Sequence, residues 1–566
     1  MTRLVRSALW VAIGMPWLFI WQGLDFTDQG YLLTGYRCFF RHPEVTEDSG
    51  HMWLVNFVGA SWDALFGGLG VLGMRALWAL CMSVCVLLAF LLTRALTSER
   101  SAALAVLAVS VFLSDRHATW FSYNALSTLL ITASGVCLVQ GIVQHSPRWL
   151  FLAGVVLGLA PFARFPNLLG WAAILAIGLA ALLEPERRRR LPRDVGLVLL
   201  GIACALCGTL LSIYVRGDAA LYFRGLHSLF EPSMQGAGYA LPSLLGQFLK
   251  DQGLALLWGL GACAGALGLA RALCCVPSRF GWLLLLGAGA LAVFVLTHKS
   301  ESWRWAVTGT SYWLLAAVVF GLWRRSIELR VAAFVVLVLL LVAPLGSNLG
   351  IKNAHMGLWL ALPLVLALLH SLDPNWLWGQ GAKLALLGGV VLCAEGVHRA
   401  ATYTYRDSRR IELRSSIDHP QLRGQFTSPE RAKSVGQVLA ALEQRVAPGD
   451  YLLAYEGTPL LQYLTRTRPY LNRPWLMGWE RGEVVQKLAQ EAPGRTGCLP
   501  VAVLTTQSAR GFDWPRNPSP LEQNEANRGA RAALQAFLRQ HAYARTWENG
   551  FFQIFEPPVE QRAQCR

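Results

Sequence analysis

The sequence has 566 residues, of which 54% are hydrophobic and only 15% are charged, whereas a soluble domain carries about 25% charged residues. This composition excludes an ordinary soluble enzyme and predicts a membrane protein. A formal net charge of +16 would favour nucleic-acid binding in a soluble protein. Here much of the positive charge lies in short connections between apolar runs, where it indicates which side of the membrane each connection is on. We therefore expect membrane lipids, and no nucleic acid, as partners.

Apolar runs long enough to cross a membrane recur from Ala8 to Val397. We predict about thirteen spans, at residues 7–23, 74–96, 101–114, 124–143, 149–163, 167–183, 195–214, 254–275, 281–297, 306–323, 331–346, 356–370 and 382–398. The first run follows Arg3 and Arg6, and aromatic residues stand where a signal peptide has its small-residue cleavage site. We therefore expect an uncleaved first span with a cytoplasmic N-terminus.

The strongly basic residues of the short connections occur on every second connection along the chain. Connections after even-numbered spans contain the strongly basic segments, which are Arg94 and Arg100, Arg148, 187–190, Arg271 and Arg279, 323–330, and Lys383. Cytoplasmic connections of membrane proteins are enriched in Lys and Arg, so we assign these segments to the cytoplasmic side. The pattern predicts a multi-pass protein of the bacterial inner (plasma) membrane, with a periplasmic or extracellular C-terminal segment.

From about residue 403 the sequence takes on the mixed polar and apolar pattern of a soluble domain. It predicts helices at 428–446, 457–465, 482–492 and 527–541, and strands at 450–456, 498–506, 542–546 and 551–555. Asn549-Gly550 between the last two strands is typical of a tight hairpin turn. The expected fold class is a mainly α polytopic membrane protein, with a transmembrane domain at 1–402 and a small extracytoplasmic α/β domain at 403–566.

The polar segment between the first two spans, residues 24–52, is the most acidic connection between spans. Asp25 and Asp28 stand at the end of the first span, where a carboxylate is costly unless it has a function or a partner. We interpret the segment as the site of a catalytic carboxylate. The alternative is a solvated acidic loop, which is favoured by the three further acids Glu44, Glu47 and Asp48.

Most of the 12 cysteines lie inside apolar runs, where a thiol behaves as a small hydrophobic group. Three of them, Cys38, Cys498 and Cys565, fall in segments that we place outside the cytoplasm. One disulfide can form among these three, and the spacing does not assign the pair.

The order of these features resembles the GT-C superfamily of polyprenyl-phosphate-sugar glycosyltransferases. It is closest to glycosyltransferase family 39, with protein O-mannosyltransferases and lipid A aminoarabinose transferases. The superfamily has an acidic motif followed by Gly and an aromatic residue after its first span, as in Asp28-Gln29-Gly30-Tyr31. A surface helix follows, matched by the amphipathic segment 53–66, and a later span ends in a run like GLAPFARFP at 158–166. An extracytoplasmic C-terminal domain is also frequent in the superfamily.

The resemblance implies transfer of a sugar from a polyprenyl-phosphate donor to an extracytoplasmic glycan, lipid or protein, with inversion at the anomeric carbon. Asp28 is our candidate for the general base that takes the acceptor's proton. Asp25, one helical turn away, would orient Asp28 or bind the acceptor.

The leaving phosphate requires cations, and an arginine binds phosphate with two parallel hydrogen bonds. Arg164, the basic residue of the GLAPFARFP run, is the first candidate. The further candidates for phosphate or substrate binding are Lys352, Arg304, His355, Asp115, Asn348, Lys299 and Arg216. For Arg164 the alternative is an arginine that reaches from the helix end to water, and for Asp115 it is an ion pair within the connection.

Gln29 departs from the pattern, because many members have a second acid at this position beside the first. Two adjacent carboxylates suit a divalent metal. The glutamine argues against a metal, unless Asp25 or Asp48 takes the place of the missing acid.

Three other functions compete with this one. A lipid-linked-sugar transporter or flippase would have charges in the middle of spans and internal repeats. An enzyme like the O-antigen ligases would have a large basic extracytoplasmic loop, whereas the first such segment here is acidic. A membrane-anchored binding or sensor protein would not require thirteen spans.

Overall fold

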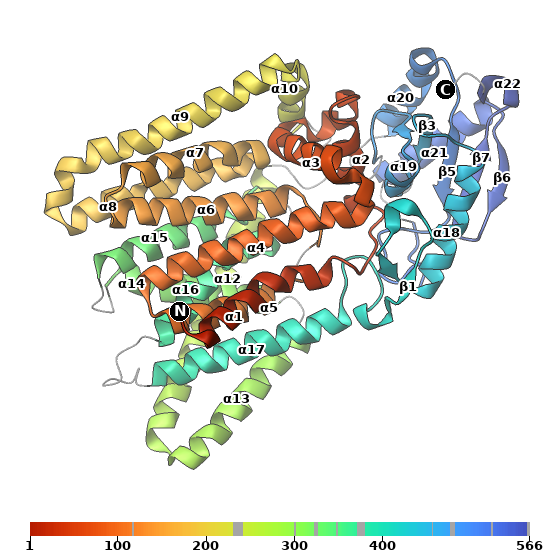
Figure 1. Ribbon diagram of the computed structural model, residues 1–566. Helices are drawn as coiled ribbons and strands as arrows, with labels where there is room; N and C mark the ends of the chain where they lie inside the picture. Colours follow the sequence, from red (N-terminus) through yellow and green to blue (C-terminus); the bar gives the residue numbers. More distant parts are fainter. Residues whose placement is uncertain are drawn as a thin grey trace.

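The computed structural model describes residues 1–115, 118–229, 241–298, 302–321, 326–346, 349–370, 380–455, 457–475, 482–521 and 525–562. A bundle of long helices is followed by a region of strands and shorter helices at one end of the bundle (Figure 1). The N-terminus lies at the opposite end of the bundle from the C-terminus (Figure 1). This arrangement agrees with the mainly α fold and the C-terminal α/β region expected from the sequence.

Each of the thirteen predicted spans coincides with a helix. These helices are α1 (Arg3–Gly14, continued by η1, Met15–Phe19), α4 (Gly70–Leu96), α5 (Glu99–Leu113), α6 (Tyr123–Val143), α7 (Pro147–Ala163), α8 (Leu175–Leu183, preceded by η4, Phe165–Ile174), α9 (Leu191–Val215), α12 (Leu241–Cys275), α13 (Ser278–His298), α14 (Ser302–Val319), α15 (Ile327–Val342), α16 (His355–His370) and α17 (Gly381–Thr402). Seven helical segments of the described chain are long and apolar enough to cross a membrane, and two apolar helices are shorter. The protein is therefore an integral membrane protein, and the number of spans stays a prediction.

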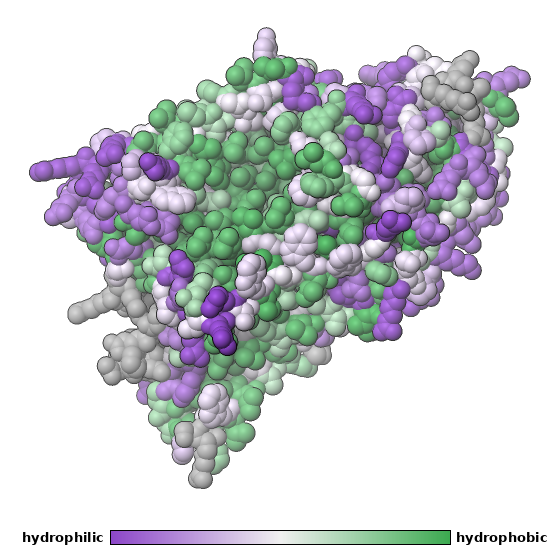
Figure 2. Space-filling view, in the orientation of Figure 1, coloured by the Kyte–Doolittle hydropathy of each residue, from purple (hydrophilic) through white to green (hydrophobic). Residues whose placement is uncertain are grey.

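Helix α16 is the innermost helix of the bundle, because its residues from His355 to Leu368 are all buried. Helices on the outside expose leucines instead, as at Leu211 of α9 and Leu257 of α12. Hydrophobic residues accordingly form a broad zone over the bundle, and hydrophilic residues gather at its two ends (Figure 2). α7 and α9 approach closely at Gly154, where an added Cβ would lie 2.1 Å from the carbonyl oxygen of Val198. Small residues allow such close packing between membrane helices.

The acidic segment after the first span is not the solvated loop that its composition favoured. It folds into α2 (Asp28–Cys38) and η2 (Pro43–Met52), and α3 (Trp53–Phe66) and η3 (Gly67–Leu69) follow. Leu33 and Tyr36 of α2 are buried in the main hydrophobic cluster, which holds the helix in place. Helix α10 (Ala219–Ser228) covers η2, and Arg224 of α10 pairs with Glu47 at 3.3 Å. α3 confirms the helix predicted at 53–66.

The C-terminal region contains a five-stranded mixed sheet in the order β4-β3-β5-β7-β6. Its elements are α18 (Pro429–Glu443), β3 (Tyr451–Ala454), α19 (Leu460–Thr465), β4 (Arg468–Pro469), α20 (Gly482–Thr496), β5 (Val501–Thr505), α21 (Glu525–Gln540), β6 (Ala544–Glu548), β7 (Phe552–Glu556) and α22 (Val559–Arg562). β4, β3 and β5 run parallel, whereas β7 is antiparallel to β5 and β6. A two-stranded sheet of β1 (Ser415–Ser416) and β2 (Phe426–Thr427) precedes them. Short 3₁₀ helices η5 (Pro185–Arg190), η7 (Gly350–Ala354), η9 (Arg410–Glu412) and η10 (Pro420–Leu422) complete the chain's described elements.

The sheet has helices on both faces, because successive side chains of a strand point to opposite faces. Leu453 and Ala502 belong to a cluster with residues of α20 and α21. Leu452 and Val501 point the other way, into the large cluster that includes α18 and continues into the bundle. The α/β fold is confirmed, and the division at residue 402 stays a prediction, because hydrophobic packing is continuous across it.

The predicted hairpin is present between β6 and β7. Gly550 has a φ of 86°, and the side-chain oxygen of Asn549 accepts a hydrogen bond from the backbone N–H of Phe552 at 2.9 Å. Of the three cysteines considered for a disulfide, Cys498 is disulfide-bonded and Cys38 is buried and free. Cys565 lies outside the described residues.

Candidate active site

Asp28 is the first residue of α2, and its side chain contacts a segment that follows the last bundle helix. The Tyr405 hydroxyl donates a hydrogen bond to Asp28 Oδ2 at 2.5 Å. Arg406 Nη2 lies 3.0 Å from the same oxygen, and the Asp28 side chain is 31% exposed. Burial raises the pKa of Asp28 above its ordinary value, and Arg406 opposes this effect. Asp28 is thus an enclosed carboxylate that a ligand can still reach.

Asp25 has a different environment, because its side chain is completely buried. Its Oδ1 accepts hydrogen bonds from the backbone N–H and the hydroxyl of Thr27, at 3.0 and 2.6 Å, and its Oδ2 accepts one from the N–H of Gln29 at 2.9 Å. Backbone N–H groups in the first turn of a helix lack partners within the helix. Asp25 therefore caps α2 and holds Asp28 in place.

The two residues that contact Asp28 form the corner of a tight turn, Thr404 to Asp407. Arg406 has a φ of 53°, in the left-handed region that non-glycine residues rarely adopt. Asp407 Oδ2 accepts a hydrogen bond from the N–H of Leu24 at 2.8 Å, and Asp407 Oδ1 pairs with Arg431 at 3.0 Å. The turn is thereby fixed both to the segment before α2 and to α18.

Sequence reasoning missed this turn. Its signal was a cluster of aromatic and charged residues, Tyr403 to Arg410, directly after the last predicted span. Such residues at the end of a span are also common in interfacial belts of membrane proteins, so the composition did not single them out.

The other residues of the Asp28-Gln29-Gly30-Tyr31 motif have structural roles. An added Cβ at Gly30 would lie 2.2 Å from the backbone nitrogen of Leu460, so only glycine allows α19 to pack against α2. The Gln29 side-chain oxygen accepts a hydrogen bond from Arg75 of α4 at 3.0 Å. Tyr31 lies against Trp475, with ring centroids 6.0 Å apart.

Arg164 follows α7 and is buried, so it does not reach out to water as the alternative reading suggested. Its Nη1 donates to the carbonyl of Ala343 at 3.1 Å and its Nη2 to that of Leu345 at 2.5 Å. Both acceptors follow the last turn of α15, where carbonyls lack helical partners. Arg164 therefore ties α7 to the end of α15, and its role toward phosphate stays a prediction.

Electrostatic interactions connect Asp28 with the predicted cations. Tyr123, at the start of α6, interacts electrostatically with both Asp28 and Arg164. His355, at the start of α16, interacts with Arg164 and Arg304. The structure thus brings Asp28, Arg164, His355 and Arg304 to the same end of the bundle.

Lys352 and Arg216 are the other predicted cations that the structure describes. The exposed Lys352 lies in η7, and its carbonyl accepts a hydrogen bond from His355 Nδ1 at 2.8 Å. Arg216 pairs with Asp218 at 2.8 Å. Asn348 and Lys299 lie outside the described residues.

Asp115 forms an ion pair, but its partner is Arg410 after α17 and not a residue of its own connection. Its Oδ1 lies 2.5 Å from Arg410 Nη2, and its backbone carbonyl accepts a hydrogen bond from Arg399 at 3.2 Å. Both arginines come from the end of α17 and the segment after it. Asp115 therefore links α5 to the C-terminal region, and substrate binding by this residue stays a prediction.

The residues that were considered for a divalent metal have other partners. Asp25 is completely buried and caps α2, and Asp48 pairs with Arg473 at 3.5 Å. Within the described ranges, no group of three or more His, Cys, Asp or Glu side chains is arranged to hold a metal. This donor set does not fit a divalent ion beside Asp28.

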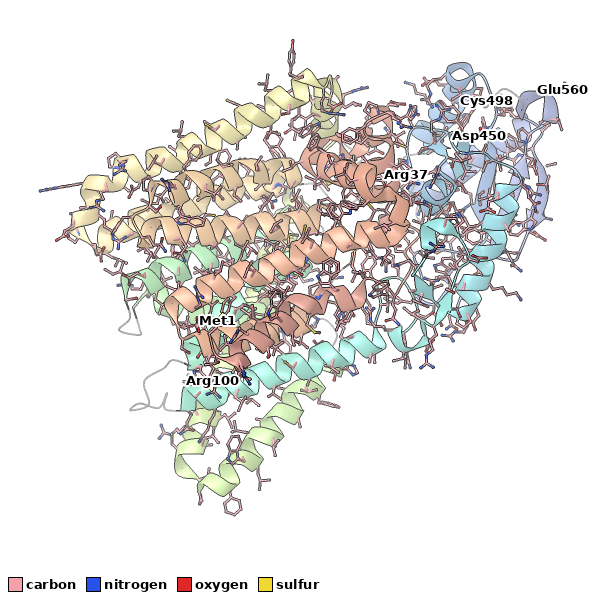
Figure 3. The ribbon with its side chains drawn as sticks, in the orientation of Figure 1. Met1, Arg37, Arg100, Asp450, Cys498 and Glu560 are labelled. Carbon is pink, nitrogen blue, oxygen red and sulfur yellow. The ribbon has the colours of Figure 1, made fainter. Side chains whose placement is uncertain are left out.

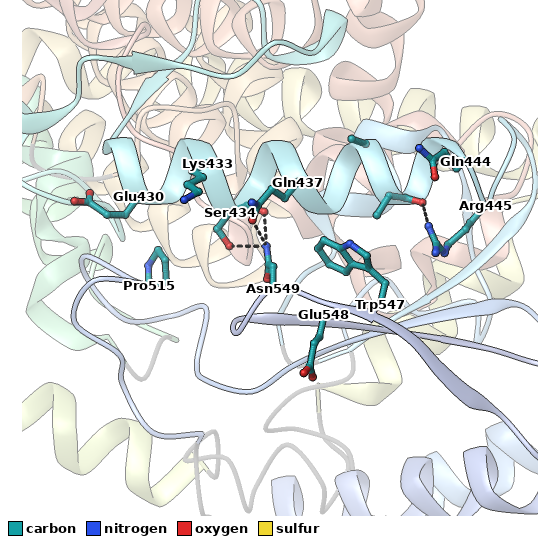
Figure 4. Close-up of a pocket in the computed structure, with 12 residues that line it drawn as sticks. Glu430, Lys433, Ser434, Gln437, Gln444, Arg445, Pro515, Trp547, Glu548 and Asn549 are labelled. Atoms are coloured by element: carbon teal, nitrogen blue, oxygen red, sulfur yellow. Dashed lines mark hydrogen bonds between the residues drawn. The ribbon is translucent and has the colours of Figure 1, made fainter.

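A groove of about 730 Å³ lies apart from these residues, between α18 and the β6–β7 hairpin (Figure 4). It is lined by residues such as Lys433, Gln437 and Trp547, and Asn549 donates a hydrogen bond across it to the carbonyl of Ser434 at 3.0 Å. None of the predicted site residues lines it. A smaller buried pocket is lined by Asn124, His355 and Trp359 and lies beside the cations.

Residues 51–213 match the family model of the dolichyl-phosphate-mannose-protein mannosyltransferases. The chain is similar to the solved structure of ArnT from Cupriavidus metallidurans bound to undecaprenyl phosphate, with 12% identity over 99% of this chain and 97% of that chain and a TM-score of 0.43. It is also similar to the apo oligosaccharyltransferase of Archaeoglobus fulgidus, with 10% identity over 89% of this chain and 69% of that chain and a TM-score of 0.45. No curated protein sequence matches the chain.

The segment that matches the family model runs from the end of η2 to α9 and includes Arg164. It contains the surface helix α3 and the GLAPFARFP run, which are two of the features that suggested the resemblance. The match therefore favours a glycosyltransferase over a transporter or a sensor. The similarity of residues 51–213 to this family supports a membrane glycosyltransferase.

Proposed function

We propose that the protein transfers a sugar from a polyprenyl-phosphate donor to an extracytoplasmic acceptor, with Asp28 as the general base. The observation that carries this proposal is the Asp28 carboxylate, which is partly exposed and is held between Tyr405 and Arg406 at the end of the first bundle helix. The matching family is named for a sugar donor of the same class, dolichyl-phosphate-mannose.

The reaction is a single displacement. An acceptor hydroxyl oxygen attacks the anomeric carbon, and the bond from that carbon to the phosphate oxygen breaks. The electron pair of that bond leaves with the polyprenyl phosphate, and the hydroxyl proton passes to Asp28. Because burial raises the pKa of Asp28, it is a stronger base than an ordinary carboxylate. Attack from the side opposite the phosphate inverts the anomeric centre.

We assign the donor phosphate to Arg164, with Arg304, His355 and Lys352 as further contacts, and we keep Asp115 and Asn348 as candidates for substrate binding. The phosphate gains a negative charge as it leaves, and fixed cations in an enclosed site stabilise that charge. The interactions of Arg164 and Arg304 with His355 support a common location for these groups.

Replacing Arg164 by alanine should weaken binding of undecaprenyl phosphate by roughly ten- to a hundredfold, because a hydrogen bond to a charged group contributes about 1.5–3 kcal/mol. The measurement is equilibrium binding of the lipid to purified protein in detergent. Arg330→Ala is the matched control, since Arg330 also donates to a carbonyl of a neighbouring helix, that of Val319 at 3.0 Å. If both variants bind equally well, Arg164 has only its structural role. If the wild-type protein does not bind the lipid, the proposed donor is wrong.

We further propose that the end of the bundle that carries Asp28 faces the periplasm or the extracellular space. Met1 and Arg100 lie at one end of the bundle, and Asp450, Cys498 and Glu560 lie beyond the other (Figure 3). Alkaline phosphatase fused after residue 566 should therefore be active in a bacterial host, and a cytoplasmic reporter at the same position should be silent. The reverse result would place Asp28 in the cytoplasm and exclude an extracytoplasmic acceptor.

A further inference from the structure

We propose that Arg406 is shared between Asp28 and the donor phosphate: it pairs with Asp28 in the empty enzyme and moves to the phosphate as the sugar is transferred. This inference rests on the proposed function and adds a phosphate-binding residue from the segment after α17. No motif of the sequence suggested this residue.

The two oxygens of Asp28 have different surroundings. Oδ2 accepts the hydrogen bond from Tyr405 at 2.5 Å and lies 3.0 Å from Arg406 Nη2. Oδ1 has no hydrogen-bond or ion-pair partner among the residues that the structure describes. We therefore assign Oδ1 to the acceptor proton, while Oδ2 fixes the orientation of the carboxylate. Burial raises the pKa of Tyr405 well above its ordinary value, so its hydroxyl stays protonated as a donor.

The Arg406 side chain bridges the N-terminal end of α2. Its Nη1 hydrogen-bonds the Thr27 hydroxyl and lies 3.8 Å from Asp25 Oδ1. The guanidinium therefore contacts both carboxylates of the site. Asp25 is completely buried, whereas Arg406 and Asp28 remain partly exposed. Of this network, Arg406 and Asp28 are the two charges that a ligand can reach.

The backbone of Arg406 is fixed although its side chain is long. Its carbonyl accepts a hydrogen bond from Arg431 Nη1 at 2.7 Å, and Arg431 itself is completely buried against Asp407. The left-handed φ of Arg406 is maintained by these contacts on both sides of the turn. A fixed backbone with a flexible side chain can change the partner of the guanidinium without moving the turn.

The charge changes of the reaction give the reason for a shared cation. Asp28 is an anion before transfer and is neutral once it holds the acceptor proton. The phosphate is a monoanionic diester in the donor and becomes a dianionic monoester when the bond to the sugar breaks. One negative charge therefore disappears at Asp28 while one appears at the phosphate. A cation between them can interact with Asp28 first and with the phosphate as its negative charge develops. It therefore stabilises the transition state more than it stabilises the bound substrate.

The test is a double-mutant cycle on binding of undecaprenyl phosphate, the product-like lipid, to purified protein. Arg406→Gln should weaken binding by roughly ten- to a hundredfold, and Arg406→Lys should recover part of the loss. Asp28→Asn should tighten binding about tenfold, because it releases Arg406. In the Arg406→Gln background, Asp28→Asn should no longer tighten binding. Arg516→Gln is the control, since Arg516 pairs with Asp513 and Glu412 outside this site.

The double-mutant cycle distinguishes two explanations: that Arg406 is shared between Asp28 and the phosphate, and that the two anions only repel each other. Repulsion alone predicts the same tightening by Asp28→Asn in both backgrounds, and that result would overturn the inference. Wild-type binding by Arg406→Gln would overturn it as well. If Asp28→Asn is inactive but Arg406→Gln binds the lipid normally, the proposed function stands and only this inference is wrong.

A pH profile gives a second readout that a purely structural role would not change. The charged or titratable groups that act on Asp28 are Arg406, Asp25, Tyr405, Arg510 and Tyr123. Because Arg406 lowers the pKa of Asp28, Arg406→Gln should move the acidic limb of kcat/KM to higher pH, and Arg406→Lys should restore it. An unshifted limb in an active Arg406→Gln enzyme would show that Arg406 does not act on the base.

Discussion

Replacing Asp28 by asparagine should abolish detectable sugar transfer. Loss of a general base typically lowers the rate by about 10²–10⁴, and asparagine retains the shape of the side chain but cannot accept the proton. The variant should be expressed normally and bind the donor at least as well as the wild type. The measurement is transfer of radiolabelled sugar from a polyprenyl-phosphate donor in membranes that carry each variant.

Two neutralising variants serve as controls for Asp28→Asn. Asp25→Asn should be milder, with a loss of stability of about 1 kcal/mol as for a weakened helix cap, because Asp25 caps α2 from a buried position. Glu47→Gln should be nearly silent, since Glu47 pairs with Arg224 near the surface. Wild-type turnover by Asp28→Asn would exclude Asp28 as the base. Loss of activity in Asp25→Asn alone would move the assignment to Asp25.

Replacing Asp407 by alanine should destabilise the protein by about 3–5 kcal/mol, as expected when one partner of a buried ion pair is removed. Asp407 and Arg431 are both completely buried, 3.0 Å apart. Without Asp407, the guanidinium of Arg431 would remain buried without its counter-charge. We expect a lower unfolding temperature in detergent and faster proteolysis between α17 and α18.

The control for Asp407→Ala is Glu548→Gln, which breaks an ion pair with Arg545 in which both side chains are about half exposed. Exposed pairs contribute about 0–1 kcal/mol, so the unfolding temperature should hardly change. The double variant Asp407→Leu/Arg431→Met should recover part of the stability, because a buried apolar pair replaces the ion pair without an unpaired charge. Equal effects of Asp407→Ala and Glu548→Gln would show that the buried pair does not hold the turn.

The helices of the bundle and most elements of the C-terminal region could be predicted from the amino-acid sequence. Long apolar runs in a membrane form helices, because the lipid offers no partners to backbone N–H and C=O groups. The thirteen predicted spans therefore coincide with helices from α1 to α17. The strands β3, β5, β6 and β7 follow from local apolar patterns and from the Asn549-Gly550 turn. The short strand β4 has no such pattern and was not predicted.

The composition of the acidic segment gave the wrong structure for residues 24–52. Its acids favoured a solvated loop, but Leu33 and Tyr36 are buried against the bundle and α10 covers η2. The segment is therefore ordered as the helix α2 and the kinked 3₁₀ segment η2. The sequence placed Asp25 and Asp28 together at the end of the first span. It contained no information on which carboxylate is buried and which remains exposed, because that depends on distant residues packed against α2.

Those distant residues come from the turn after α17. Tyr405, which bonds Asp28, lies 377 positions further along the chain. The spacing of apolar residues shows which face of a segment is buried. It does not show which residues from distant parts of the chain contact that segment. The buried pair of Asp407 and Arg431 brings the turn to α2, so the environment of Asp28 depends on packing between the bundle and the C-terminal region. Charge pairing and burial across that junction are properties of the folded chain, and they leave Asp28 and Arg406 partly exposed while Asp25, Asp407 and Arg431 are buried.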